Sequence, residues 1–132
     1  ANDEPKAPGL RDAPTDGTLV GHLGQIAPRS LVVVPEGVTD SLTAALAWPD
    51  AVVLGAHGAA QLPAIVAAAA PRVAAQRGRL VIVADPDRPG QDAAVEGAAH
   101  ALRVGLSMHR DLDLLEFGVL DLNGAWCDGW RP

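Results

Sequence analysis

The chain has 132 residues, which is enough for one domain with its own hydrophobic core. The formal charge is −6, and one lysine and nine arginines are scattered along the sequence, so composition does not indicate a strong nucleic-acid binder. A single cysteine, Cys127, excludes an internal disulfide framework and a cysteine-based zinc site. No apolar run reaches the roughly 18 residues of a membrane-spanning helix, and no signal-peptide pattern is present, so we expect a cytoplasmic protein that does not bind membranes.

The first 16 residues, "ANDEPKAPGLRDAPTD", are polar and rich in proline and aspartate. Such composition predicts a flexible N-terminal segment or linker. We expect residues 17–132 to form a single domain, excised from a larger protein.

Apolar runs and helical patterns alternate along that domain. The apolar runs predict buried strands at 30–37, 51–55 and 79–85, and helical spacing predicts helices at 39–48, 61–78 and 89–105. Pro71 is expected to kink or split the second helix. A fourth strand is expected at 106–110, and "LLEFGVLDL" is a candidate for another. The alternation predicts an α/β fold: a compact, Rossmann-like three-layer sandwich with a mostly parallel central sheet of about four strands.

All three predicted helices show apolar residues at helical spacing, which in the second are Leu62, Ile65, Val66 and Val73. In the first, Thr39 or Asp40 is expected to be the N-cap. The apolar positions on one face of each helix are Leu42, Ala45 and Leu46 in the first, and Val95, Ala98, Ala99 and Leu102 in the third.

Carboxylates follow two of the predicted strands. Glu36 comes directly after the first strand with Asp40 four residues later, and Asp85 and Asp87 follow the third strand. Ligands of parallel sheets bind outside the carboxyl ends of the strands, so we expect the four acids to share one pocket. Like charges repel unless they are neutralised, and a hard divalent cation with oxygen ligands is the simplest partner. Gly90 permits a tight entry into the helix that follows.

The same stretches resemble the motifs of the Toprim domain. "VVVPEGVTDSLTAAL" is similar to its first motif, a strand followed by Glu-Gly, two residues, Asp and a helix. "VIVADPDRPGQDAA" is similar to its second motif, a strand ending in Asp-x-Asp-x-x-Gly. "VVLGAHGA" and "LDLNGAW" resemble further segments of primase-type members. The resemblance covers roughly residues 30 to 126 and is closest to the primase and primase-helicase branch.

The resemblance implies a Toprim fold and a nucleotidyl- or phosphoryl-transfer activity on nucleic acid, as in a DNA primase or primase-helicase of DNA replication. It implies that Glu36 is the catalytic acid or base, that Asp85 and Asp87 coordinate Mg²⁺ or Mn²⁺, and that Asp40 supports the site or holds a second metal ion. DNA or RNA and nucleoside triphosphates are the implied partners, mainly through other domains. The candidates for contact with substrate are Gly37, His57, Arg88 and Gly90.

Two alternative functions remain open at this stage. In the first, the chain is an OLD-type metal-dependent nuclease domain that uses the same acids. In the second, it is a non-catalytic Toprim-like interaction module. A response-regulator receiver and a haloacid-dehalogenase phosphatase are disfavoured, because each needs a late lysine and the only lysine is Lys6. Trp126, Cys127 and Trp130 are expected to pack on the sheet edge or on a neighbouring domain.

Overall fold

The computed structural model describes residues 20–115 and 121–132, and the predicted flexible segment 1–16 lies outside them. Four strands form one parallel sheet in the order β2-β1-β3-β4: β1 (Leu31–Pro35), β2 (Val52–Val53), β3 (Arg79–Val83) and β4 (Leu112–Leu115). The helical elements are η1 (Leu23–Gln25), α2 (Val38–Ala47), α3 (Leu62–Ala75), α4 (Arg88–Arg103) and α5 (Leu122–Cys127). In this part of the chain, no helix combines the length and the apolar character needed to cross a membrane.

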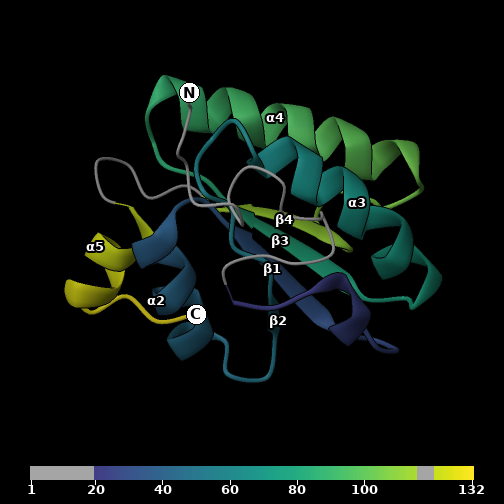
Figure 1. The fold of residues 1–132 in the computed structure, drawn as a ribbon, viewed down its shortest axis with the longest axis horizontal. Helices are drawn as coiled ribbons and strands as arrows, with labels where there is room; N and C mark the ends of the chain where they lie inside the picture. Colours follow the sequence, from purple (N-terminus) through teal and green to yellow (C-terminus); the bar gives the residue numbers. More distant parts are fainter. Residues whose placement is uncertain (1–19, 116–120) are drawn as a thin grey trace, which may run out of the picture.

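The elements form three layers (Figure 1). Helices α3 and α4 lie side by side on one face of the sheet, and α2 and α5 lie on the other. Successive residues of a strand point to opposite faces, so Val32 and Val34 of β1 join the core under α3 and α4, while Val33 joins the core with Ala44 of α2. Both faces of β1 are therefore buried, which explains its uninterrupted apolar sequence and confirms the predicted α/β architecture.

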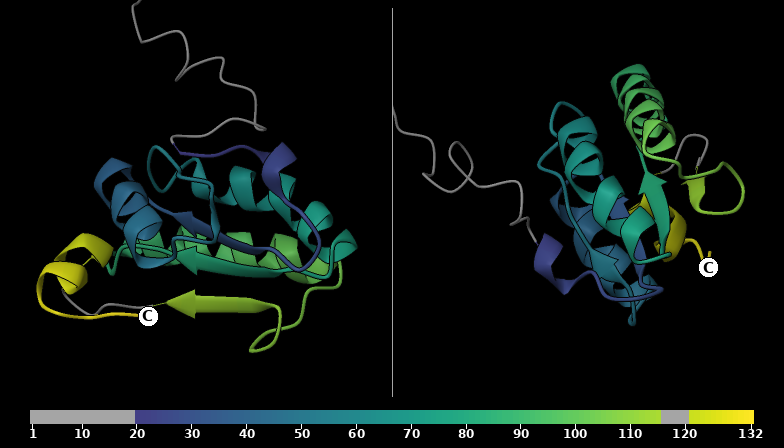
Figure 2. Two further views of the ribbon diagram at one scale, coloured as in Figure 1. Left: turned by 90° about the horizontal axis from the view of Figure 1, so that it is seen from below. Right: turned by 90° about the vertical axis from the view of Figure 1, so that its right-hand side faces the viewer.

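The order of the strands creates a switch point in the sheet. From β1 the chain passes through α2 to the edge strand β2, returns through α3 to β3 on the other side of β1, and continues through α4 to β4. The strands all point towards the end of the molecule that carries α5 (Figure 2). Because the chain leaves β1 and β3 in opposite directions, their carboxyl ends lie at the position where open α/β sheets bind ligands.

The fourth strand lies later than the sequence predicts. The prediction of a strand at 106–110 is wrong: residues 107–111 form a turn in which Ser107 O accepts hydrogen bonds from Asp111 N and Leu112 N, both at 3.0 Å. His109 in this turn has a φ of 65°, which is incompatible with an extended strand. Residues 114–115 of "LLEFGVLDL" belong to β4, and 116–120 lie outside the described residues. Pro71 does not divide α3, which continues to Ala75.

The predicted apolar faces of two helices match their buried faces only in part, since Ala98 of α4 is buried but several larger residues are not. Helix α2 leaves Leu42 and Leu46 61% and 66% exposed, and α4 leaves Val95 68% exposed. The residues that α2 buries are Asp40, Ser41, Thr43 and Ala44, and those that α4 buries are Gly90, Ala93, Ala94, Gly97, Ala98 and Ala101. Small residues permit the close approach of α4 to α3, since a Cβ on Gly97 would lie 3.3 Å from Cγ2 of Val66. The N-cap of α2 is Gly37, not Thr39 or Asp40.

Matched leucine truncations test these orientations. We expect Leu42→Ala to change the free energy of unfolding by less than about 0.5 kcal/mol, because the side chain is mostly in water. Leu54→Ala removes the same atoms from a fully buried position and should cost about 2–5 kcal/mol. Urea unfolding of both variants measures the difference, and similar losses in the two would contradict the observed orientation of α2.

Candidate metal centre

Glu36 and Asp85 meet at the switch point, as the sequence predicts. The register of β1 and β3 pairs Pro35 with Val83, so the residues that follow leave the sheet at the same level. Glu36 N donates to Val83 O at 3.0 Å, and the Glu36 side chain accepts a hydrogen bond at Oε1 from Asp85 N at 3.2 Å. The Glu36 carboxylate is thereby held beside Asp85, the second residue after β3.

Two glycines make room for this arrangement. Gly37 has a φ of 84°, a left-handed conformation that glycine adopts without strain, and it turns the chain from β1 into α2. A Cβ on Gly90 would lie 2.5 Å from Asp85 O and 2.9 Å from Glu36 Oε1. Only glycine therefore lets the first turn of α4 approach the acids this closely.

A third segment brings another carboxylate to the site. Oxygen atoms of Asp40, Asp85 and Asp121 lie within 4.8 Å of one another. Helix α5 is fixed to α2 by polar contacts: Asn123 N donates to Asp40 Oδ1, and Thr43 Oγ1 donates to Asn123 Oδ1, both at 3.0 Å. These bonds hold Asp121, the residue before α5, next to Asp40. We call Asp40, Asp85 and Asp121 the aspartate triad.

The sequence reasoning did not name Asp121 as a ligand. A usable signal was present, because "DLNG" is an N-cap pattern and Asp121 accepts a hydrogen bond from Gly124 N at 2.7 Å. The sequence therefore indicates that Asp121 begins a helix. It does not indicate that Asp121 lies next to Asp40, eighty-one positions earlier, because this depends on the packing of α5 against α2.

The aspartate triad fits a hard divalent cation. Mg²⁺ prefers oxygen ligands at about 2.1 Å, which places ligand oxygens about 3 to 4.2 Å apart. The oxygens of the triad lie close to that spacing before any ion draws them together. Asp40 is buried and Asp85 half-buried, whereas Asp121 is exposed, so the site opens to solvent on the side of α5. An open side is what a metal centre needs if it is to admit a substrate.

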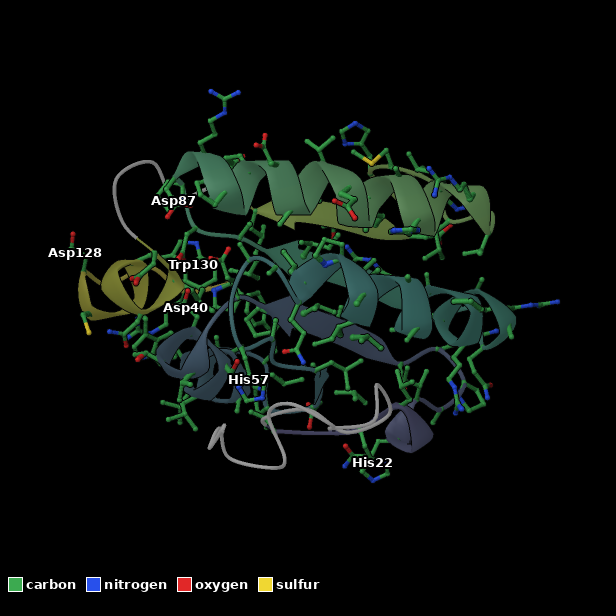
Figure 3. All side chains as sticks on the ribbon, turned by 45° about the horizontal axis from the view of Figure 1, so that its top comes forward. His22, Asp40, His57, Asp87, Asp128 and Trp130 are labelled. Atoms are coloured by element: carbon green, nitrogen blue, oxygen red, sulfur yellow. The ribbon has the colours of Figure 1, made fainter. Side chains whose placement is uncertain are left out.

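The other predicted site residues lie around the triad. Figure 3 shows Asp40, Asp87 and His57 at the end of the molecule towards which the strands point. Asp87 is the N-cap of α4 and accepts from Gly90 N at 2.8 Å, outside the triad. Arg88 is exposed and lies 3.8 Å from Asp92 one helical turn later. The backbone N–H of His57 donates to Gln61 Oε1 at 2.7 Å, and its ring is exposed.

No protein-family model matches the chain, and no curated protein matches it. The case for a function is therefore made from the residues and their geometry.

Burial and mutual repulsion change the acidity of two carboxyl groups. Burial is the main cause that raises the pKa of Glu36 to about 7; repulsion from Asp85 adds to it and the hydrogen bond from Asp85 N opposes it. Burial likewise raises the pKa of Asp40 to about 7, with repulsion from Asp121 and Asp85 in the same direction and the bond from Asn123 N opposing it. Without a cation, the site therefore retains protons near neutral pH.

Gly90→Ala tests the close approach of α4 to the acids. The added methyl group would overlap Asp85 O and Glu36 Oε1, so the first turn of α4 must move. We expect a loss of about 1–3 kcal/mol in the free energy of unfolding, as for other overpacked sites, together with weaker Mg²⁺ binding. Gly129→Ala is the control for metal affinity: its Cβ would meet no atom, so Mg²⁺ binding should not change, although its φ of 101° disfavours alanine and lowers stability. Loss of stability without any loss of metal affinity would contradict the proposed geometry.

The raised pKa values predict how stability depends on pH. Between the ordinary values of 4.5 for Glu36 and 3.8 for Asp40 and the folded values of about 7, the folded metal-free chain holds protons that the unfolded chain releases. Stability therefore falls as pH rises through this interval, and the contribution is complete only below the ordinary values. Urea unfolding in EDTA between pH 4 and 8 should show this fall, and the double variant Glu36→Gln, Asp40→Asn should lack it. An identical profile in the double variant would refute the assignment.

Proposed function

We propose that the chain is a divalent-metal-dependent phosphoryl-transfer domain that acts on nucleic acid, with nucleotidyl transfer of the DNA primase type as its reaction. The observation that carries the proposal is the meeting of carboxylates from three separate segments at the switch point of the sheet. The resemblance of "VVVPEGVTD" and "VADPDRPG" to Toprim motifs supplies the reaction class, because these motifs contain Glu36, Asp40 and Asp85.

Separate tasks fall to the different acids. The aspartate triad would hold Mg²⁺ or Mn²⁺, with Asp87 at the edge of the site as the cap of α4. When bound, the ion would neutralise the carboxylates and stabilise charge on the phosphoryl oxygens. The protein's own contribution is to fix Asp40 Oδ1 in advance through the backbone N–H of Asn123, and to fix Glu36 Oε1 through the backbone N–H of Asp85.

Glu36 is placed to move a proton. Its Oε1 accepts a hydrogen bond from Asp85 N, and the carboxyl group would exchange a proton with a hydroxyl group of the substrate. A pKa of about 7 suits this role, because a general acid or base works best when its pKa lies near the working pH. Its removal should therefore abolish chemistry while the triad still binds metal.

Calorimetric titration of the chain with Mg²⁺ and Mn²⁺ tests the metal site. We expect Asp85→Asn and Asp121→Asn each to weaken affinity about tenfold or more, a loss of about 1.4 kcal/mol. Glu36→Gln should weaken it less, because Glu36 lies outside the triad. Asp92→Asn is a matched control on the exposed outer face of α4 and should leave the affinity unchanged. Absence of binding by the unaltered chain would favour a non-catalytic interaction module.

Activity assays complete the same test. Incubation with a DNA template, nucleoside triphosphates and Mg²⁺ should produce labelled oligonucleotides, and Glu36→Gln should abolish the product. Cleavage of the template without synthesis would instead favour a nuclease.

A further inference from the structure

A second charged surface lies at the opposite end of the sheet from the aspartate triad. Six of the eight arginines in the described residues lie where the strands begin, and all six are exposed. We call this surface the arginine edge; it consists of Arg29, Arg72, Arg77, Arg79, Arg103 and Arg110. These arginines are scattered along the sequence. The fold brings them together because α3 and α4 end at this edge and β1, β3 and β4 start there (Figure 2).

Most of this positive charge is not neutralised within the described residues. Arg79 is paired with Asp113, whereas Arg29, Arg72, Arg77, Arg103 and Arg110 have no carboxylate partner there. The carboxylate of Asp111 is bonded to Ser107 Oγ at 3.0 Å. Arg77 and Arg110 line a hollow of about 350 Å³ whose wall includes the glycines at positions 78 and 105. The edge thus offers two guanidinium groups, together with Asp111, around an accessible depression.

The backbone under two of these arginines favours another residue. Helices α3, α4 and α5 end in the same way, with a left-handed residue two positions after the last helical one. That residue is Gly105 after α4 and Gly129 after α5, but it is Arg77, with a φ of 56°, after α3. Arg29, with a φ of 61°, is also left-handed, and its N–H donates to Gln76 O at 2.8 Å. Both positions would suit glycine better, so the backbone does not explain their side chains.

Helix electrostatics account for only part of the edge. Positive side chains in the last turn of a helix stabilise its free carbonyl groups, which explains Arg72 in α3 and Arg103 in α4. Arg29 and Arg110 lie in the turns before β1 and β4 and belong to no helix. The helix dipole therefore does not explain their charge.

We propose that the arginine edge binds the phosphate backbone of a nucleic-acid strand, at a surface separate from the aspartate triad. The choice of polymer rests on the proposed function. The side chains are compatible with this choice, since guanidinium groups match phosphate oxygens with two parallel hydrogen bonds. The starts of adjacent strands are about 4.8 Å apart. Arg29 lies just before β1, Arg79 begins β3 and Arg110 lies just before β4, so these arginines follow the order of three neighbouring strands, along which a chain of phosphates can run. The overall charge of −6 makes the binding weak and sensitive to salt.

The double variant Arg29→Gly, Arg77→Gly tests the proposal without damage to the fold. Glycine suits both left-handed positions, so the variant should be at least as stable as the unaltered chain. Fluorescence anisotropy with a labelled poly(dT) of roughly 20 nucleotides, in EDTA, measures affinity at about 20 to 200 mM salt. We expect the affinity of the glycine variant for poly(dT) to be about tenfold lower at low salt. The slope of log affinity against log salt concentration should be smaller by about 1.4, because two phosphate contacts are lost. Arg29→Lys, Arg77→Lys keeps the charge and should keep the slope.

Every other outcome overturns the proposal. No binding at low salt, or equal binding by the glycine variant, would show that the edge does not contact the strand. Equal competition by poly-glutamate would point to an acidic protein partner instead. EDTA removes the metal, so the anisotropy assay tests the arginine edge alone, and the metal titration tests the aspartate triad alone. A negative result in one experiment does not affect the conclusion from the other.

Discussion

The constraint on which the site depends is the burial of two carboxyl groups, Glu36 and Asp40, next to other acids. They are only 7% and 5% exposed, and each receives a hydrogen bond from a backbone N–H group, of Asp85 and Asn123 respectively. One hydrogen bond does not offset the cost of burying an ionised carboxylate, which explains why both groups hold protons near neutral pH. A cation that replaced these protons would compensate the buried negative charge. This is the physical reason for proposing a metal ion at the site.

The parts of the fold that sequence predicted follow from local patterns. Long β-branched runs identified β1 and β3, and the meeting of Glu36 with Asp85 followed because neighbouring parallel strands end at the same edge. The inner face of α2 did not follow, since the helix turns Asp40 and Thr43 inwards to reach α5 and leaves Leu42 in water. There, tertiary contacts with a helix eighty residues away override the apolar pattern.

Features that depend on contacts between distant segments could not be predicted from the sequence. Asp121 joins the site only through the packing of α5 on α2, and the arginine edge arises only from the positions at which three strands start and two helices end. The fourth strand was misplaced for a related reason. "LSMHR" has strand-like composition, but the left-handed His109 and the bonds to Ser107 O form a turn that delays β4 to Leu112.

The directions of the strands and helices explain why acidic residues gather at one end of the sheet and arginines at the other. Helices in a parallel α/β sheet run opposite to the strands, so α2, α4 and α5 begin at the acidic end, where their free N–H groups favour negative charge. Gly90 N and Gly124 N donate to Asp87 and Asp121 there. The opposite end has the free carbonyl groups of α3 and α4, which favour arginine. One backbone arrangement therefore supports both an acidic end and a basic end, and a nucleic-acid strand that contacted both, as proposed, would lie along the length of the sheet.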